Sequence, residues 1–209
     1  MEKGDDWRMT IINKFRIKND FESAFELTCK MSDCLACKNN FEHRFYTGSS
    51  NAKIMIINDC ATKDEEIIEY YNDLINLSNL KVDDVMQVYA VSCITTRKDK
   101  DRIVQRMPSK KECNNCKPDL DKIIDIVKPK VIISLGATAL NQFKPGSNLL
   151  EYVNSKQVFN GIPTLINFSV KDLFNLCEYK SDEEINEISS SILATFNEAA
   201  KYIQGGSNE

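Results

Sequence analysis

Five cysteines have spacings that are typical of metal-binding sites. Cys34 and Cys37 form one C-x-x-C pair, Cys113 and Cys116 form a second, and Cys93 lies between the two pairs. The two pairs together would supply the four thiolates of a tetrahedral zinc site. Alternatively, Cys34, Cys37, Cys93 and one cysteine of the second pair would supply four thiolates to an iron–sulfur cluster. Spacing alone leaves both possibilities open.

The setting of these cysteines favours metal binding or reactivity over disulfides. The chain has eight cysteines in 209 residues, and its first residues are charged where a signal peptide needs an apolar run. No segment is long and apolar enough to cross a membrane. We therefore expect an intracellular protein, in the cytoplasm or nucleoid, with no membrane association. The remaining cysteines, which lie in or beside apolar segments, are interpreted as buried packing residues: Cys29, Cys60 and Cys177.

A basic segment lies between Cys93 and Cys116. From Arg97 to Lys111 it holds seven basic residues against two acidic ones, although the whole chain has a formal net charge of −4. Such side chains can pair with phosphates and give salt-dependent, sequence-independent affinity for nucleic acid. The alternative is a charged loop that is simply solvated. The candidate DNA-binding residues are Arg97, Lys98, Lys100, Arg102, Arg106, Lys110 and Lys111.

Strands that alternate with helices are expected to position these residues. Apolar runs predict buried strands over 53–58, 85–92 and 131–135, and the turn Asn160-Gly161 suggests a hairpin-like edge. Capping signals predict helices that start at Thr62, Ser109 and Ser181. A further helix over 20–31, a loop over 94–108 and a helix from 137 complete the pattern.

This alternation predicts one three-layer α/β/α domain with a central, mostly parallel sheet of about four strands. The domain spans 1–209, with its core over about 20–204 and a flexible tail over 205–209. Gly136 follows the third buried strand directly and precedes a helix. Such a turn is a common ligand site in α/β proteins, although many occur for packing reasons only.

The segment MPSKKECNNCKPDLDKIIDIVKPKVIISLGATAL, from Met107 to Leu140, resembles the iron–sulfur branch of the uracil-DNA glycosylase superfamily, called family 4. That family has a Pro-rich loop, a helix with a Glu four residues before its last cluster cysteine, then an apolar strand and Leu-Gly-Ala-x-Ala. Glu112 and Cys116 match the Glu and the cysteine, and Ile162-Pro163-Thr164 matches the start of the last family motif. The resemblance extends from about Cys34 to Ile203.

The resemblance implies a uracil-DNA glycosylase-like fold and a 4Fe–4S cluster. Its ligands would be Cys34, Cys37, Cys93 and Cys116, with Cys113 as a spare thiol. Zinc stays the alternative metal.

The motifs that carry the family's chemistry are altered. Asn58-Asp59 stands where the family has Gly-Glu, so Asp59 keeps the carboxylate, and the loop that carries the base-stacking aromatic residue has no counterpart. Tyr89 replaces an Asn that reads the uracil edge, and Ile166 or Asn167 replaces a His. The single histidine, His43, is interpreted as an exposed loop residue.

From this resemblance we expect a DNA-binding iron–sulfur protein in which base excision is weakened, altered or lost. If it is active, it would be a monofunctional DNA glycosylase that hydrolyses an N-glycosidic bond. Asp59 would then position water, Asn167 would meet the base anion, and Asn58 and Tyr89 would shape the base pocket. The alternative is a non-catalytic subunit that holds DNA or a protein partner in a replication, repair or transcription complex. A third possibility is a metalloprotein that acts on a free nucleotide.

Overall fold

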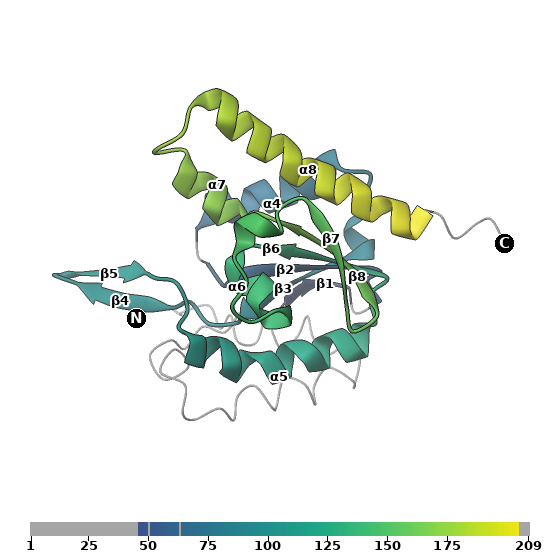
Figure 1. Cartoon of the computed structure of the whole chain (residues 1–209), viewed down its shortest axis with the longest axis horizontal. Coiled ribbons are helices and arrows are strands. Elements are labelled where there is room, and N and C mark those ends of the chain that lie inside the picture. Colours follow the sequence, from purple (N-terminus) through teal and green to yellow (C-terminus); the bar gives the residue numbers. More distant parts are fainter. Residues whose placement is uncertain (1–45, 50, 63, 205–209) are drawn as a thin grey trace, which may run out of the picture.

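The computed structural model describes residues 46–49, 51–62 and 64–204. At its centre lies a six-stranded sheet with the order β1-β3-β2-β6-β8-β7 (Figure 1). The four inner strands are parallel, whereas β1 and β7 are antiparallel to their neighbours. The strands are β1 Tyr46–Gly48, β2 Ile54–Cys60, β3 Val85–Val91, β6 Val131–Leu135, β7 Ser155–Phe159 and β8 Ile162–Asn167.

Helices cover both faces of this sheet. α4, α7 and α8 pack on one face, and α5 and α6 lie on the other (Figure 1). This arrangement confirms the three-layer α/β/α class and the mostly parallel sheet, but the sheet has six strands rather than about four, because an antiparallel strand is added at each edge. The helices are α4 Glu65–Leu77, α5 Lys110–Val127, α6 Ala137–Phe143, α7 Val170–Leu176 and α8 Asp182–Gln204, with short 3-10 turns at Val82–Asp84 and Leu149–Glu151.

The inner strands are apolar on both faces because helices cover both faces. In β2, Ile54 and Ile56 contribute to the core beneath α4 and α8, whereas Met55 and Ile57 contribute to the core beneath α5. β6 is buried along its whole length in the same way. The core therefore lies on both sides of β2 and β6, and it fixes the carboxyl ends of the inner strands.

Two capping predictions have different outcomes. The capping box of Ser109 and Glu112 is present, and α5 begins directly after it. The prediction of Thr62 as the cap of α4 is wrong, because the Asp64 side chain accepts the hydrogen bond from the Ile67 backbone N–H. The Thr62 hydroxyl instead accepts a hydrogen bond from the Asp64 backbone N–H.

The predicted loop over 94–108 is largely a two-stranded hairpin, formed by β4 Thr96–Asp99 and β5 Arg102–Gln105. Its strands are too polar to show the apolar alternation by which strands are usually detected. In Figure 1 this hairpin extends away from the sheet and helices.

Several predicted features lie outside the described residues. These are Cys29, Cys34, Cys37 and His43, the helix over 20–31 and the tail over 205–209. Of the helices that the structure does describe, none has both the length and the apolarity needed to cross a bilayer.

Candidate functional site

Three predicted site residues lie in one row at the carboxyl edge of the sheet. Tyr89 of β3 pairs with Asn58 of β2, Asn58 pairs with Leu135 of β6, and Leu135 pairs with Asn167 of β8. Residues in register on parallel strands point to the same face, which here is the face beneath α4 and α8, because Leu135 belongs to that core. The structure thus brings Asn58, Tyr89 and Asn167 into one row, at the edge where open α/β sheets bind ligands.

Asp59 follows Asn58 and points to the opposite face, toward α6. Its Oδ1 atom accepts hydrogen bonds from the backbone N–H groups of Thr138 (2.8 Å) and Ala139 (3.0 Å). Gly136 makes this approach possible, because a Cβ atom there would lie 2.3 Å from the Asp59 Oδ2 atom. The turn at Gly136, between β6 and α6, therefore binds the Asp59 carboxylate of the same chain.

The electrostatics of Asp59 are dominated by its burial. The side chain is 5% exposed, and burial, followed by the charge of Asp172, raises its pKa to about 7. The hydrogen bonds from Ala139 and Thr138 lower the pKa but do not offset the burial. Near neutral pH the carboxyl group can therefore hold or release a proton, as a group that positions or activates water must.

Asn58 is 3% exposed, and in the described part of the chain neither its Oδ1 nor its Nδ2 atom has a hydrogen-bond partner. Each such buried polar group costs about 1–3 kcal/mol. Native proteins rarely leave a buried amide in this state unless a ligand, water or a functional role accounts for it. Sequence reasoning placed Asn58 in the base pocket, but it could not show that both ends of its amide are unpaired.

Asn167 is fully buried, and its amide is engaged within the protein. Its Nδ2 atom donates to Thr195 Oγ1 (2.8 Å), Ser191 Oγ (3.0 Å) and Asn154 Oδ1 (3.0 Å). Its Oδ1 atom accepts a hydrogen bond from the Phe168 backbone N–H. These bonds join β8 to α8, and a base anion would compete with them for the Asn167 donors.

The base of the β4–β5 hairpin is fastened to the chain that follows Asp59. The Gln105 Nε2 atom donates to the Ala61 carbonyl oxygen at 3.0 Å and lies 3.4 Å from the Cys60 Sγ atom. The Thr62 hydroxyl donates to the Gln105 Oε1 atom at 3.5 Å. Gln105 therefore connects the hairpin to the carboxyl end of β2.

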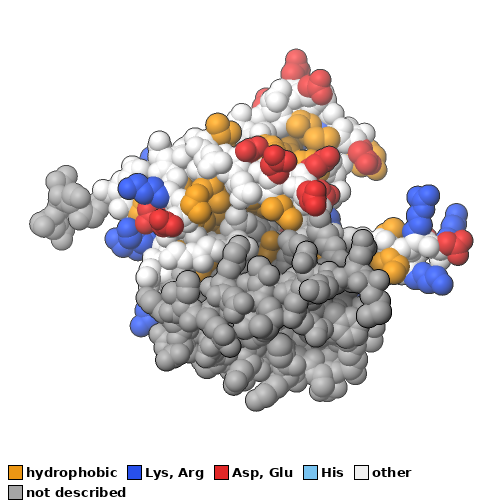
Figure 2. Space-filling model, turned by 180° about the vertical axis from the view of Figure 1, so that it is seen from behind, with side chains coloured by type: hydrophobic (Ala, Val, Ile, Leu, Met, Phe, Trp, Pro, Cys, Tyr) orange, Lys and Arg blue, Asp and Glu red, His pale blue; other side chains and the backbone are white. Residues whose placement is uncertain are grey.

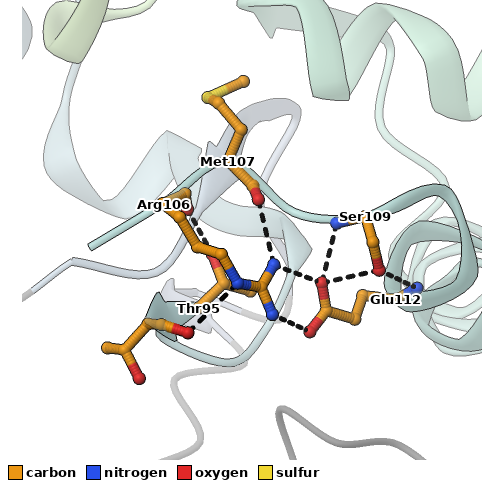
Figure 3. Close-up of polar contacts among 6 residues, drawn as sticks. Thr95, Arg106, Met107, Ser109 and Glu112 are labelled. Carbon is orange, nitrogen blue, oxygen red and sulfur yellow. Dashed lines mark hydrogen bonds and ion pairs between the residues drawn. The ribbon is translucent and has the colours of Figure 1, made fainter. Parts of the chain in front are cut away.

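Arg106 fastens the hairpin to α5 (Figure 3). Its guanidinium forms a two-point ion pair with the buried Glu112, and it also donates to the backbone oxygens of Thr96 and Met107. Hydrogen bonds from Arg106, and further bonds from Ser109, lower the pKa of Glu112 to about 2. Arg106 thus differs from the other predicted phosphate-binding residues, because its guanidinium is committed to holding the structure together.

The other six predicted DNA-binding residues are all exposed. Lys and Arg side chains gather on the projecting hairpin, where Asp99 and Asp101 are the acidic neighbours (Figure 2). The exposed residues are Arg97, Lys98, Lys100 and Arg102 on the hairpin and Lys110 and Lys111 at the start of α5.

The structure describes two of the predicted cluster ligands, Cys93 and Cys116, and both are buried. Cys93 precedes the β4–β5 hairpin in the chain, and Cys116 follows it. Cys93 is 1% exposed shortly after β3, and Cys116 is 7% exposed in α5. Cys116 packs with Val91 and Cys60, so the end of β3 that leads to Cys93 lies against it. Buried thiols are suitable donors for zinc or an iron–sulfur cluster. Among the described residues no group of three or more metal-binding side chains occurs, and only two of the four predicted ligands are among them.

The interpretation of the other cysteines is confirmed in one case and wrong in another. Cys60 is buried, as expected, and sequence reasoning missed that it packs against Cys116. Cys177 is exposed, because it lies at the C-terminal cap of α7 rather than inside an apolar segment.

Comparison with known families gives one assignment. The model of the family described as the uracil DNA glycosylase superfamily matches residues 43–199, which include the whole sheet. No curated protein matches the chain. The chain belongs to the uracil DNA glycosylase superfamily.

Proposed function

We propose that this protein is a DNA-binding member of its superfamily in which base excision is weakened, altered or lost. The observation that carries the proposal is the β4–β5 hairpin, which projects from the glycosylase-like core and exposes four cationic side chains. Cations that neutralise phosphates supply affinity for DNA without reading sequence. The superfamily assignment supports DNA as the polyanion.

The hairpin is built to present these cations with little ordering cost. The Gln105 bonds hold it to the end of β2, and the Arg106–Glu112 pair holds it to α5. A preorganised element loses less conformational entropy on binding than a flexible loop does. Arg97, Lys98, Lys100 and Arg102 then lie beyond these fixed points and meet the phosphates.

The carboxyl edge of the sheet would form the base pocket. The unpaired Asn58 amide offers a donor and an acceptor to a flipped base, and Tyr89 lies beside it in the row. Cleavage of the N-glycosidic bond places positive charge on the sugar and negative charge on the base. In an active protein, Asp59 positions the attacking water and Asn167 donates to the base anion.

A specific observation favours the second candidate, a non-catalytic subunit that holds DNA or a protein partner. Both proposed catalytic groups have structural tasks: Asp59 anchors α6, and Asn167 joins β8 to α8. Groups that are engaged in this way are less available to a reacting sugar and base. In this candidate the scaffold and the hairpin serve a replication, repair or transcription complex.

We further propose a 4Fe–4S cluster held by Cys34, Cys37, Cys93 and Cys116, with zinc as the alternative metal. Support comes from the burial of Cys93 and Cys116 and from their positions on either side of the hairpin. The bound metal or cluster would be a structural cross-link. It would connect Cys34 and Cys37 to Cys93 and Cys116, which precede and follow the hairpin in the chain. Cys113, which is half-buried, would remain outside the ligand set.

The DNA-binding proposal is tested by the salt dependence of binding to a fluorescent duplex. Replacing Arg97, Lys98, Lys100 and Arg102 by Ala should weaken binding and reduce the slope of log K against log salt by about 0.9 for each phosphate that is no longer neutralised. A charge-matched control replaces four exposed body lysines by Ala, namely Lys81, Lys130, Lys180 and Lys201. If the hairpin variant and the control have the same affinity and slope, the hairpin does not bind DNA.

A further inference from the structure

Lys171 is a half-buried cation at the carboxyl edge of the sheet, in the first turn of α7 directly after the end of β8. The capping box of Ser169 and Asp172 fixes this first turn. The backbone N–H of Val170 also donates a hydrogen bond to the hydroxyl of the buried Tyr71, at 3.2 Å. The backbone that carries Lys171 is therefore held firmly beside the candidate site.

The Lys171 ammonium lies close to Asp59, the candidate acid–base group. Burial raises the pKa of both the Asp59 carboxyl and the Cys60 thiol, whereas the positive charge of Lys171 lowers both. Because the interaction between two charges falls off with distance, the ammonium must lie near both side chains. Within the described part of the chain, the Lys171 ammonium forms no ion pair and no hydrogen bond. Its amine is thus available to a ligand at this edge of the sheet.

We propose that this protein cleaves DNA at abasic sites, with Lys171 as the amine nucleophile and Asp59 as the group that moves protons. At an abasic site, the open-chain form of the deoxyribose exposes an aldehyde carbon, C1′. The amine of a lysine forms a Schiff base with such a carbonyl carbon. The inference rests on the proposed DNA binding but not on base excision, because the substrate has already lost its base.

The reaction balances with water as its only co-reactant. The ionised Asp59 carboxylate takes a proton from the Lys171 ammonium, and the amine forms a bond to C1′ of the aldehyde. Asp59 returns the proton to the departing hydroxyl, which leaves as water, so that a protonated imine remains. The carboxylate then removes a proton from C2′, the C3′–O3′ bond breaks, and the proton passes to the released 5′-phosphate. Hydrolysis of the imine restores Lys171.

The features that oppose base excision do not oppose this reaction. An abasic sugar carries no base, so it needs neither a stacking aromatic residue nor a donor from Asn167, whose amide is engaged with α8. Its extrusion from the duplex also costs less, because no base has to be unpaired or unstacked. The hairpin cations would bind flanking phosphates beside the site, because Gln105 joins the hairpin to Ala61, two residues after Asp59.

The test uses full-length protein and a duplex in which a separate glycosylase has first converted one uracil into an abasic site. Borohydride reduces the imine and leaves a covalent protein–DNA complex, which is measured on a denaturing gel, and peptide mapping identifies the linked lysine. The wild type should be linked at Lys171 and should cut the strand without alkali. Lys171→Arg should lose both signals, because a guanidinium keeps the charge but always stays protonated. The control Lys180→Arg, which replaces an exposed lysine beyond the other end of α7, should retain both.

Asp59→Asn tests the second half of the proposal. It should slow both the formation of the covalent complex and the cleavage of the strand by at least about 100-fold, because an amide cannot transfer the protons. Rates equal to those of the wild type would remove Asp59 from the reaction.

Binding to the same abasic duplex separates this inference from the proposed function. Lys171→Arg should bind with nearly the affinity and salt slope of the wild type, because its charge is kept. If the wild type binds with a steep salt slope but forms no covalent complex, the lyase is overturned and DNA binding stands. The same conclusion follows if Lys171→Arg is linked equally well through an exposed lysine of the hairpin. If the wild type does not bind duplex DNA, the proposed function fails together with the lyase.

Discussion

Arg106 and Glu112 form a two-point ion pair across the base of the β4–β5 hairpin, with Nη1–Oε2 and Nη2–Oε1 distances of 2.8 and 2.7 Å. The Glu112 side chain is 4% exposed, and it also accepts hydrogen bonds from Ser109, the cap of α5. One carboxylate therefore serves both the helix cap and the anchor of the hairpin. Arg106 therefore holds the hairpin in place, whereas the other cationic residues of the hairpin are exposed.

Arg106→Ala should lower the free energy of unfolding by about 2–4 kcal/mol, because it leaves the buried Glu112 carboxylate without its cation. Urea unfolding measures the change. Arg102→Ala is the control, and its effect should stay within about 0.5 kcal/mol because Arg102 is exposed. Equal stability of the two variants would show that the ion pair does not anchor the hairpin.

Asp59 should make stability depend on pH in the neutral range. Its pKa of about 7 in the folded protein lies above the usual 3.8, so the folded state binds the proton more tightly than the unfolded state does. The resulting stabilisation is complete below pH 3.8 and is lost as the pH rises through about 7. Asp59→Asn keeps an acceptor for Thr138 and Ala139 but cannot ionise.

The difference in free energy of unfolding between wild type and Asp59→Asn, measured from pH 4 to pH 8, isolates this carboxyl group from the others that titrate. We expect the wild type to lose stability relative to the variant as the pH rises through about 7. A difference that stays constant with pH would mean that Asp59 ionises normally.

Asn58 and Asn167 should respond in opposite ways to replacement by Leu. Asn58→Leu removes two unpaired buried polar atoms, so it should leave stability unchanged or raise it by about 1–3 kcal/mol. Asn167→Leu breaks the bonds to Thr195, Ser191 and Asn154 and should destabilise the fold. Thermal unfolding of both variants measures this. A large loss of stability in Asn58→Leu would contradict the assignment of its amide to a ligand.

The proposed cluster ligands can be separated from their neighbours by single substitutions. After anaerobic purification, Cys93→Ser and Cys116→Ser should each lose iron and acid-labile sulfide. Cys113→Ser and Cys60→Ser should retain them, although both residues pack beside Cys116. Loss of iron from Cys113→Ser with retention in Cys116→Ser would move the last ligand to Cys113. Zinc in place of iron in the wild type would select the alternative metal.

The regular elements were predictable because their signals are local. Val131–Leu135 is a run of apolar residues interrupted only by Ser134 and ended by Gly136. The structure has a strand over Val131–Leu135 and a helix that begins at Ala137. The capping signals at Ser109 and Ser181 likewise mark the starts of α5 and α8. Such features depend on residues that are close in sequence, so one sequence is sufficient to find them.

The roles of individual site residues were less predictable, because they depend on side-chain contacts that the tertiary fold creates. Composition groups Arg106 with the exposed cations, and only the tertiary structure shows that it pairs with Glu112. The alternation of β2 sends Asn58 and Asp59 to opposite faces, but the sequence does not show that α6 receives the Asp59 carboxylate. The hairpin strands were missed because charged residues occupy both of their faces.

The central claim is that a glycosylase scaffold here binds DNA while excision is weakened, altered or lost. The most direct measurement is a single-turnover assay with iron-loaded protein and a uracil-containing duplex, under conditions where binding is saturated, followed by alkaline cleavage of abasic sites. We predict a salt-sensitive complex with slow or undetectable release of uracil. Rapid uracil release that Asp59→Ala abolishes would contradict the claim and show that the altered site is an efficient uracil-excising enzyme.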